Sequence, residues 1–150
     1  SGFISSAEKH RFKLHNVLIW HKNNKTPSRW YMKSCEFIVF MRKGAAKPIH
    51  DRSCDHYFRV KNISGRDKLH PTQKPVTLLK ELIVNSSLPG DVVLDPFMGA
   101  ASTGVAALAA GRKFTGIEID SGFFELGRDR LKSALQQGDL WPSCDDDNSA

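Results

Sequence analysis

The stretch that decides the fold is DVVLDPFMGAASTGVAALAAGRKFTGIEID, residues 91–120. A short apolar run is followed by a turn of small residues, an alanine-rich segment that ends on Gly111, and a second apolar run at 113–120. Glycine just beyond the last helical residue is a common helix end. This order of strand, turn, helix and strand predicts two parallel strands joined by a helical crossover.

The segments on either side of this stretch extend the same α/β pattern. The proline-bracketed turn HPTQKP at 70–75 precedes apolar residues at helical spacing, and SSLPG at 86–90 stops that helix. After the second strand, residues 121–138 predict another helix. From residue 91 onward the sequence therefore reads β-α-β-α.

The N-terminal third predicts strands of a different kind. NVLIWHK (16–22) and EFIVFMRKG (36–44) are rich in branched and aromatic residues, and a polar loop separates them. We expect two antiparallel neighbours. Residues 45–70 show little periodicity and predict an irregular region.

Length and composition bound the class of protein. With 150 residues, 40% of them hydrophobic and 25% charged, the chain can form a real core. No run approaches the ~18 apolar residues of a membrane span, and no signal-peptide pattern opens the chain. We therefore expect a cytoplasmic protein. Three cysteines without a CxxC pair favour reduced thiols, and His50, Cys54 and His56 lack a fourth ligand at zinc spacing, so no metal site is predicted.

The charge is unevenly distributed. Residues 1–80 carry 17 Lys and Arg against 5 Asp and Glu, whereas residues 81–150 carry 5 against 11. A basic half suggests a surface that faces a polyanion such as nucleic acid. A merely solvated basic face explains the charge equally well.

The turn at 95–101 has the character of a ligand site. A small-residue turn between a strand and a helix offers free backbone N–H groups, as in nucleotide-binding sheets. Glu118, at the end of the second strand, is placed to accept hydrogen bonds from ribose hydroxyls. Asp95 would repel a pyrophosphate but attract an ammonium group, so the pattern favours an adenosyl compound that bears an amino acid.

These motifs resemble a known family. DPFMGAASTG followed by GIEID and preceded by HPTQKP is similar to the S-adenosylmethionine (AdoMet) binding half of the DNA methyltransferases that modify N6 of adenine or N4 of cytosine. The order resembles the permuted β group, in which the catalytic segment precedes the AdoMet segment. NVLIWHKNN and EFIVFMRKG resemble late strands of that group. The resemblance implies a Rossmann-like, AdoMet-dependent methyltransferase fold.

The resemblance also implies roles for individual residues. Asp95 would lie near the methionine end of AdoMet, Phe97 and Gly99 would shape the turn, and Glu118 would bind the ribose. The residues that would close over the methionine moiety are Thr72, Gln73, Lys74 and Pro75. Taken singly, Lys74 could be a solvated turn lysine and Asp95 a helix cap; their joint order and spacing favour the site.

The sequence departs from the family pattern at two points. The family usually has glycine where this chain has Ala101, and a Cβ there would crowd the cofactor or strain a turn that prefers positive φ. The catalytic motif, a polar or acidic residue followed by Pro-Pro-aromatic, does not occur, so no catalytic residue is predicted. The fold is thus expected to be partial, with its central catalytic strands missing. We expect the chain to form a homo-oligomer, to pair with a separate N-terminal catalytic half, or to rearrange its sheet.

The basic N-terminal region predicts the DNA contacts. It mixes cations with aromatic rings in a way that suits phosphates and bases, and the candidates are Lys22, Lys25, Arg29, Trp30 and Lys33. The alternative is a hairpin loop whose aromatic rings pack on the core. We divide the chain into a target-recognition-like region at 1–69, an AdoMet-binding segment at 70–138 and an acidic tail at 139–150.

Three functions remain in view. The first, which we favour, is the C-terminal AdoMet-binding part of a site-specific DNA methyltransferase of a restriction-modification system. It would be active only with a missing half. The second is a methyltransferase relic that binds DNA or a protein partner without catalysis. The third, an enzyme acting on a small molecule, lacks an identifiable acid or base. Whether the isolated chain is an enzyme and which base it methylates stay open.

Overall fold

The structure, a computed structural model, describes residues 2–45 and 47–138 and shows two compact units. The first unit comprises Ser1–Lys68 and Val84–Ser87, and the second comprises Leu69–Ile83 and Leu88–Ala150. The predicted acidic tail, 139–150, lies outside the described residues. The functional division at residues 69 and 70 stays a prediction.

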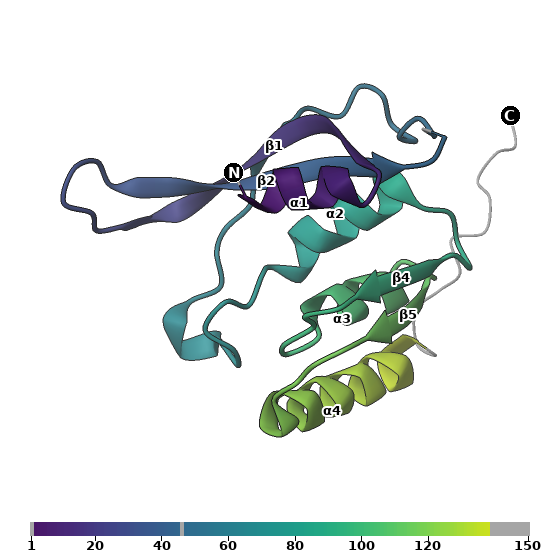
Figure 1. The fold of residues 1–150 in the computed structure, drawn as a ribbon. Coiled ribbons are helices and arrows are strands. Elements are labelled where there is room, and N and C mark those ends of the chain that lie inside the picture. Colours follow the sequence, from purple (N-terminus) through teal and green to yellow (C-terminus); the bar gives the residue numbers. More distant parts are fainter. Residues whose placement is uncertain (1, 46, 139–150) are drawn as a thin grey trace, which may run out of the picture. The chain divides into compact units, whose positions relative to one another are not determined.

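The first unit is built on a three-stranded sheet. Its elements are α1 (Gly2–Lys9), β1 (Phe12–Thr26), β2 (Lys33–Lys43), β3 (Tyr57–Arg59) and the 3-10 helix η1 (Gly65–Asp67). The strand order is β2-β1-β3. β1 and β2 pair antiparallel, as predicted, and form the long hairpin of Figure 1. β3 runs parallel to β1.

Parts of this unit differ from the sequence prediction. β1 extends beyond both of its predicted ends, and β2 begins three residues before its predicted start, so only residues 27–32 connect them. Residues 45–70 contain β3 and η1 rather than irregular chain alone. A strand of three residues is too short to show alternation, and it forms by pairing with a distant part of the chain. The prediction of an irregular region was wrong at these two elements.

The second unit contains the predicted strand-helix alternation. Its elements are α2 (Val76–Ser86, whose last residues belong to the first unit), β4 (Val92–Asp95), α3 (Ser102–Leu108), β5 (Lys113–Gly116) and α4 (Ser121–Gly138). β4 and β5 pair in parallel from Val92 opposite Lys113 to Asp95 opposite Gly116. The parallel pair joined by a helix is confirmed, although β5 is shorter than the predicted strand at 113–120.

The core of the second unit lies on one face of this two-stranded sheet. Ile83, Ala106 and Ala107 are buried and pack with apolar residues that include Val93 of β4 and Phe114 of β5. Because side chains alternate along a strand, Val92 and Leu94 point to the opposite face. They are 64% and 59% exposed, so that face carries exposed apolar side chains. Within the described ranges, 2–45 and 47–138, no helix has both the length and the apolar character to cross a membrane.

Candidate functional site

The turn after β4 is fixed by backbone hydrogen bonds to the segment after β5. Asp95 ends β4, and its Oδ1 accepts the N–H of Phe97 at 3.0 Å. The N–H of Met98 donates to the carbonyl of Ile117 at 3.0 Å, and the N–H of Ile117 donates to the carbonyl of Asp95 at 2.9 Å. These bonds bring the carboxyl ends of two parallel strands together. In open α/β sheets, ligands bind at this edge.

Glu118 ties the two strand ends together. Its Oε2 accepts the N–H of Gly99 at 2.8 Å, and its Oε1 accepts the N–H of Asp120 at 2.9 Å. The hydrogen bond from the Asp120 N–H, followed by weaker ones from Gly99 and Ile119, lowers the pKa of Glu118. The carboxylate is therefore ionised and oriented. Each oxygen keeps a further lone pair that can accept a bond from a ligand hydroxyl.

Ala101 adopts the left-handed conformation that the sequence analysis expected of a glycine. Its φ is +55° and its ψ is +36°, immediately before α3. The residue is fully buried, and its methyl lies beside Gly127 of α4. The expected backbone strain is therefore present. The methyl, however, is enclosed within the unit and is not on the solvent-facing side of the turn.

The helix α4 packs against the same turn. The Arg130 guanidinium donates to the carbonyl of Ala100 and lies 3.4 Å from Oγ of Ser102. Burial lowers the pKa of Arg130. A Cβ on Gly127 would lie only 3.0 Å from the carbonyl oxygen of Gly99, so a side chain there would fit only if the turn moved by a few tenths of an ångström.

The loop 70–75 is held by its own hydrogen bonds. The N–H of Leu69 donates to Oε1 of Gln73 at 2.8 Å, and the N–H of Gln73 donates to the carbonyl of His70 at 3.0 Å. Pro75 is buried, and Lys74 is half-buried. The predicted residues Thr72, Gln73, Lys74 and Pro75 thus belong to one ordered loop in the same unit as the turn 95–99.

His70 places that loop beside the turn. Its ring meets the ring of Phe123 edge to face, with centroids 4.1 Å apart. Three of its ring atoms lie 3.4–3.5 Å from where a Cβ of Gly99 would be. His70 was not among the site residues predicted from the sequence. A histidine packed against a glycine that has φ of +51° is a contact that only the folded chain reveals.

Two large apolar side chains near the carboxyl ends of β4 and β5 are exposed. Phe97, from the turn after β4, is 87% exposed, and Ile119 is 100% exposed. Phe97 was predicted from the sequence as a site residue, and Ile119 was not. The signal in the sequence was an isoleucine directly after the acidic residue that was expected to bind the ribose. Both side chains leave apolar surface at the same edge of the sheet as Glu118.

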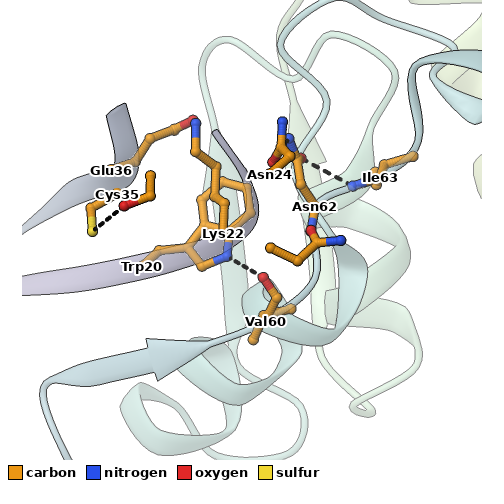
Figure 2. A network of polar contacts seen from close by, with 10 residues as sticks. Trp20, Lys22, Asn24, Cys35, Glu36, Val60, Asn62 and Ile63 are labelled. Carbon is orange, nitrogen blue, oxygen red and sulfur yellow. Dashed lines mark hydrogen bonds and ion pairs between the residues drawn. The ribbon is translucent and has the colours of Figure 1, made fainter. Parts of the chain in front are cut away.

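In the first unit, Lys22 is part of the interior. It is 8% exposed, its Nζ is 3.1 Å from Oε1 of Glu36, and it lies 5.8 Å from the centre of the Trp20 ring. Figure 2 shows this network, in which Nε1 of Trp20 also donates to the carbonyl of Val60 at 2.8 Å. Lys22 was predicted to contact DNA. Its burial and its pairing give it a structural role instead, because sequence charge alone cannot reveal a partner on the adjacent strand.

The side chains at the tip of the β1–β2 hairpin are exposed, unlike that of Lys22. Trp30 and Tyr31 are 80% and 89% exposed. The Arg29 guanidinium lies 5.3 Å from the centre of the Trp30 ring, within the range of a cation–π contact. Lys25 and Lys33 are exposed as well. The alternative, in which these aromatic rings pack on the core, is wrong for Trp30.

Comparison with known proteins shows which family and which individual proteins the chain is similar to. A family model of DNA methylases, N6_N4_Mtase, matches residues 2–129. The chain is 53% identical over 76 residues to the DNA adenine methyltransferase YhdJ of Escherichia coli K12, an alignment that covers 51% of this chain and 26% of that protein. It is 31% identical over 152 aligned positions to the type II methyltransferase M2.DpnII of Streptococcus pneumoniae, covering 85% of this chain and 54% of that one.

Solved structures agree with these relatives. The M1.HpyAVI–SAM complex matches with a TM-score of 0.74 at 31% identity, over 87% of this chain and 68% of that chain. The cytosine-N4-specific PvuII methyltransferase matches with a TM-score of 0.71 at 17% identity, which supports the fold alone. The chain spans about half the length of the type II methyltransferases that it matches.

Proposed function

The chain belongs to the N6/N4 family of DNA methylases, and from that membership we propose that it is the AdoMet-binding part of a DNA methyltransferase. The methyl acceptor would be an exocyclic amine, N6 of adenine or N4 of cytosine. Bound AdoMet would supply an electrophilic methyl group. The residues of this chain would bind and orient the cofactor, and strands outside this chain would supply the residues that act on the base.

The geometry around Gly99 supports binding of AdoMet. Glu118 would accept hydrogen bonds from the ribose, because its carboxylate is ionised and fixed at the end of β5. Asp95 would attract the ammonium of the methionine moiety, and its carboxylate is oriented by the N–H of Phe97. Phe97 and Ile119 offer apolar surface for the adenine ring. The loop 70–75, including Lys74, would lie over the methionine carboxylate.

The hairpin tip supports binding of DNA. Arg29, Lys25 and Lys33 supply positive charge for phosphates, and Trp30 supplies an exposed ring. The M2.DpnII relative is named as a type II methyltransferase, and the family model is one of DNA methylases. We propose double-stranded DNA as the partner of this surface.

The exposed face of the β4–β5 sheet supports a requirement for further strands. Val92 and Leu94 leave apolar surface in water, and each strand of the pair has one edge that no described strand pairs. Such faces and edges are costly unless they are covered. The missing Pro-Pro-aromatic motif and the length of the relatives agree with a second polypeptide segment that carries the catalytic strands. A homo-oligomer or a rearranged sheet would also cover this face.

The observation that carries the proposal is the bond from the Gly99 N–H to Glu118, which joins the turn after β4 to the end of β5. The test is calorimetric titration of the full chain with S-adenosylhomocysteine, with Asp95→Ala and Asp91→Ala as a matched pair. Asp91 is an exposed carboxylate just before the same strand. We expect Asp95→Ala to abolish measurable binding and Asp91→Ala to leave it unchanged.

Equal binding by both variants would remove Asp95 from the site. Absence of binding by the parent chain at millimolar ligand would favour the second candidate, a relic that binds DNA or protein without catalysis. The missing catalytic motif is the observation behind that candidate. A neighbouring or fused segment with a D/N/S-Pro-Pro-aromatic motif would favour the methyltransferase.

A further inference from the structure

His70 makes three contacts that meet at the candidate cofactor site. Its Nδ1 lies 3.2 Å from the backbone N of Thr72 and 3.0 Å from Oγ1 of the same residue. Its ring packs on Phe123 at the start of α4 and approaches Gly99 in the turn. The imidazole therefore stands between the loop 70–75, the turn 95–99 and α4.

The hydrogen-bond pattern fixes the tautomer of this histidine. A backbone N–H can only donate, so the Nδ1 that faces the Thr72 N–H must carry a lone pair. In the neutral ring the proton then resides on Nε2. A doubly protonated imidazolium has no acceptor and would lose the bond to Thr72.

We infer that His70, with its ring proton on Nε2, is a positioning residue that docks the loop 70–75 against the glycine turn. One side of the ring is used for packing and Nδ1 is used as a hydrogen-bond acceptor. The consequence for ligand binding rests on the proposed function, because the loop would close over AdoMet only when it is held beside Gly99.

Two substitutions separate the two uses of the ring. Asparagine at this position places Oδ1 near the place of Nδ1, so His70→Asn keeps the acceptor for the Thr72 N–H but loses most of the contact with Phe123. His70→Phe keeps an aromatic ring against Phe123 but has no acceptor. Both variants are made in the full chain, and circular dichroism checks that each one folds.

Three readouts follow. Nitrogen-15 NMR of the imidazole should show a protonated Nε2 and an unprotonated Nδ1 in the parent chain. Hydrogen exchange at the Thr72 amide should be slow in the parent and in His70→Asn and at least several-fold faster in His70→Phe. Binding of S-adenosylhomocysteine should weaken several-fold in both variants, because His70→Asn loses the ring that meets Phe123 and Gly99 and His70→Phe loses the acceptor for the Thr72 N–H.

Binding like the parent by either variant overturns the inference. If His70 only fills space, His70→Phe binds like the parent and His70→Asn is the weak variant. A proton on Nδ1 overturns it as well, even if a variant fails to fold. If the parent chain binds no S-adenosylhomocysteine, the proposed function fails, while the tautomer and the exchange rate of Thr72 still decide whether His70 docks the loop.

Discussion

The methyl group of Ala101 occupies the space that Gly127 leaves open. A Cβ on Gly127 would stand 3.2 Å from the Ala101 Cβ and 3.0 Å from the Gly99 carbonyl oxygen, both tighter than ordinary contacts. The turn can therefore keep an alanine in a left-handed conformation because the facing residue of α4 has no side chain. The two residues form a complementary pair of one methyl and one gap.

This pairing predicts non-additive stability. Gly127→Ala should destabilise the chain by about 1–3 kcal/mol through overpacking. Ala101→Gly should change stability by less than about 1 kcal/mol, because relief of left-handed strain offsets the lost methyl burial. In the double variant, part of the Gly127→Ala loss should be recovered, a coupling of about 1 kcal/mol that urea unfolding measures. Strict additivity would show that the two residues do not share this space.

Glu118 predicts a dependence of stability on pH. Backbone N–H groups, that of Asp120 first, hold its pKa below the ordinary glutamate value. Its contribution is therefore fully present above that ordinary value and is lost as the pH falls through the lowered pKa. Unfolding curves of the parent and of Glu118→Gln should differ at neutral pH and converge in strong acid. A constant difference across that acidic range would contradict this assignment.

The Lys22–Glu36 pair predicts an asymmetric response to mutation. Glu36→Gln leaves the buried ammonium of Lys22 without its carboxylate and should cost about 1–2 kcal/mol, less than a fully buried pair because Glu36 is partly exposed. Adding Lys22→Met removes the stranded charge and should restore stability toward that of the parent. Chemical denaturation of the two single variants and the double variant measures this. A double variant less stable than Glu36→Gln would refute it.

Variants at the tip and at the base of the β1–β2 hairpin should differ in their effect on DNA binding. Fluorescence anisotropy with a duplex, repeated over several salt concentrations, gives the slope of log K against log salt. Arg29→Ala should weaken binding and reduce the magnitude of that slope by about 1. Lys22→Met should leave the slope unchanged, because Lys22 is buried and paired with Glu36. Equal effects of both variants on the slope would argue against the tip as the contact surface.

The second unit was predictable from sequence because its elements follow local rules. The apolar run before Asp95, the small residues of α3 and Gly111 at its end mark strand, helix and stop within thirty residues. Glu118 was placed by its position at a strand end, and the structure joins it to Gly99.

The remaining features depend on distant partners. β3 forms only because β1 offers an edge to it, and α1 carries no buried residue that would give a clear apolar face. Lys22 looked like a surface cation until Glu36 of the next strand was placed beside it. His70 became informative only through Phe123, more than fifty residues away in the chain. Pattern and composition cannot supply such pairings.

The short pairing of β3 has a consequence for how the chain opens. β3 contacts β1 through three residue pairs. The hydrogen bond from Trp20 to Val60, just after β3, joins residues that are 40 positions apart, whereas the bond between Gly99 and Glu118 joins residues that are 19 apart. Closing the longer loop costs more conformational entropy, and the β1–β3 contact offsets this cost with only three residue pairs. Local unfolding should therefore release β3 while the β1–β2 hairpin persists, so the amides of β3 should exchange with deuterium long before those of Leu18 and Trp20, which alternate with Ile19 and face β2.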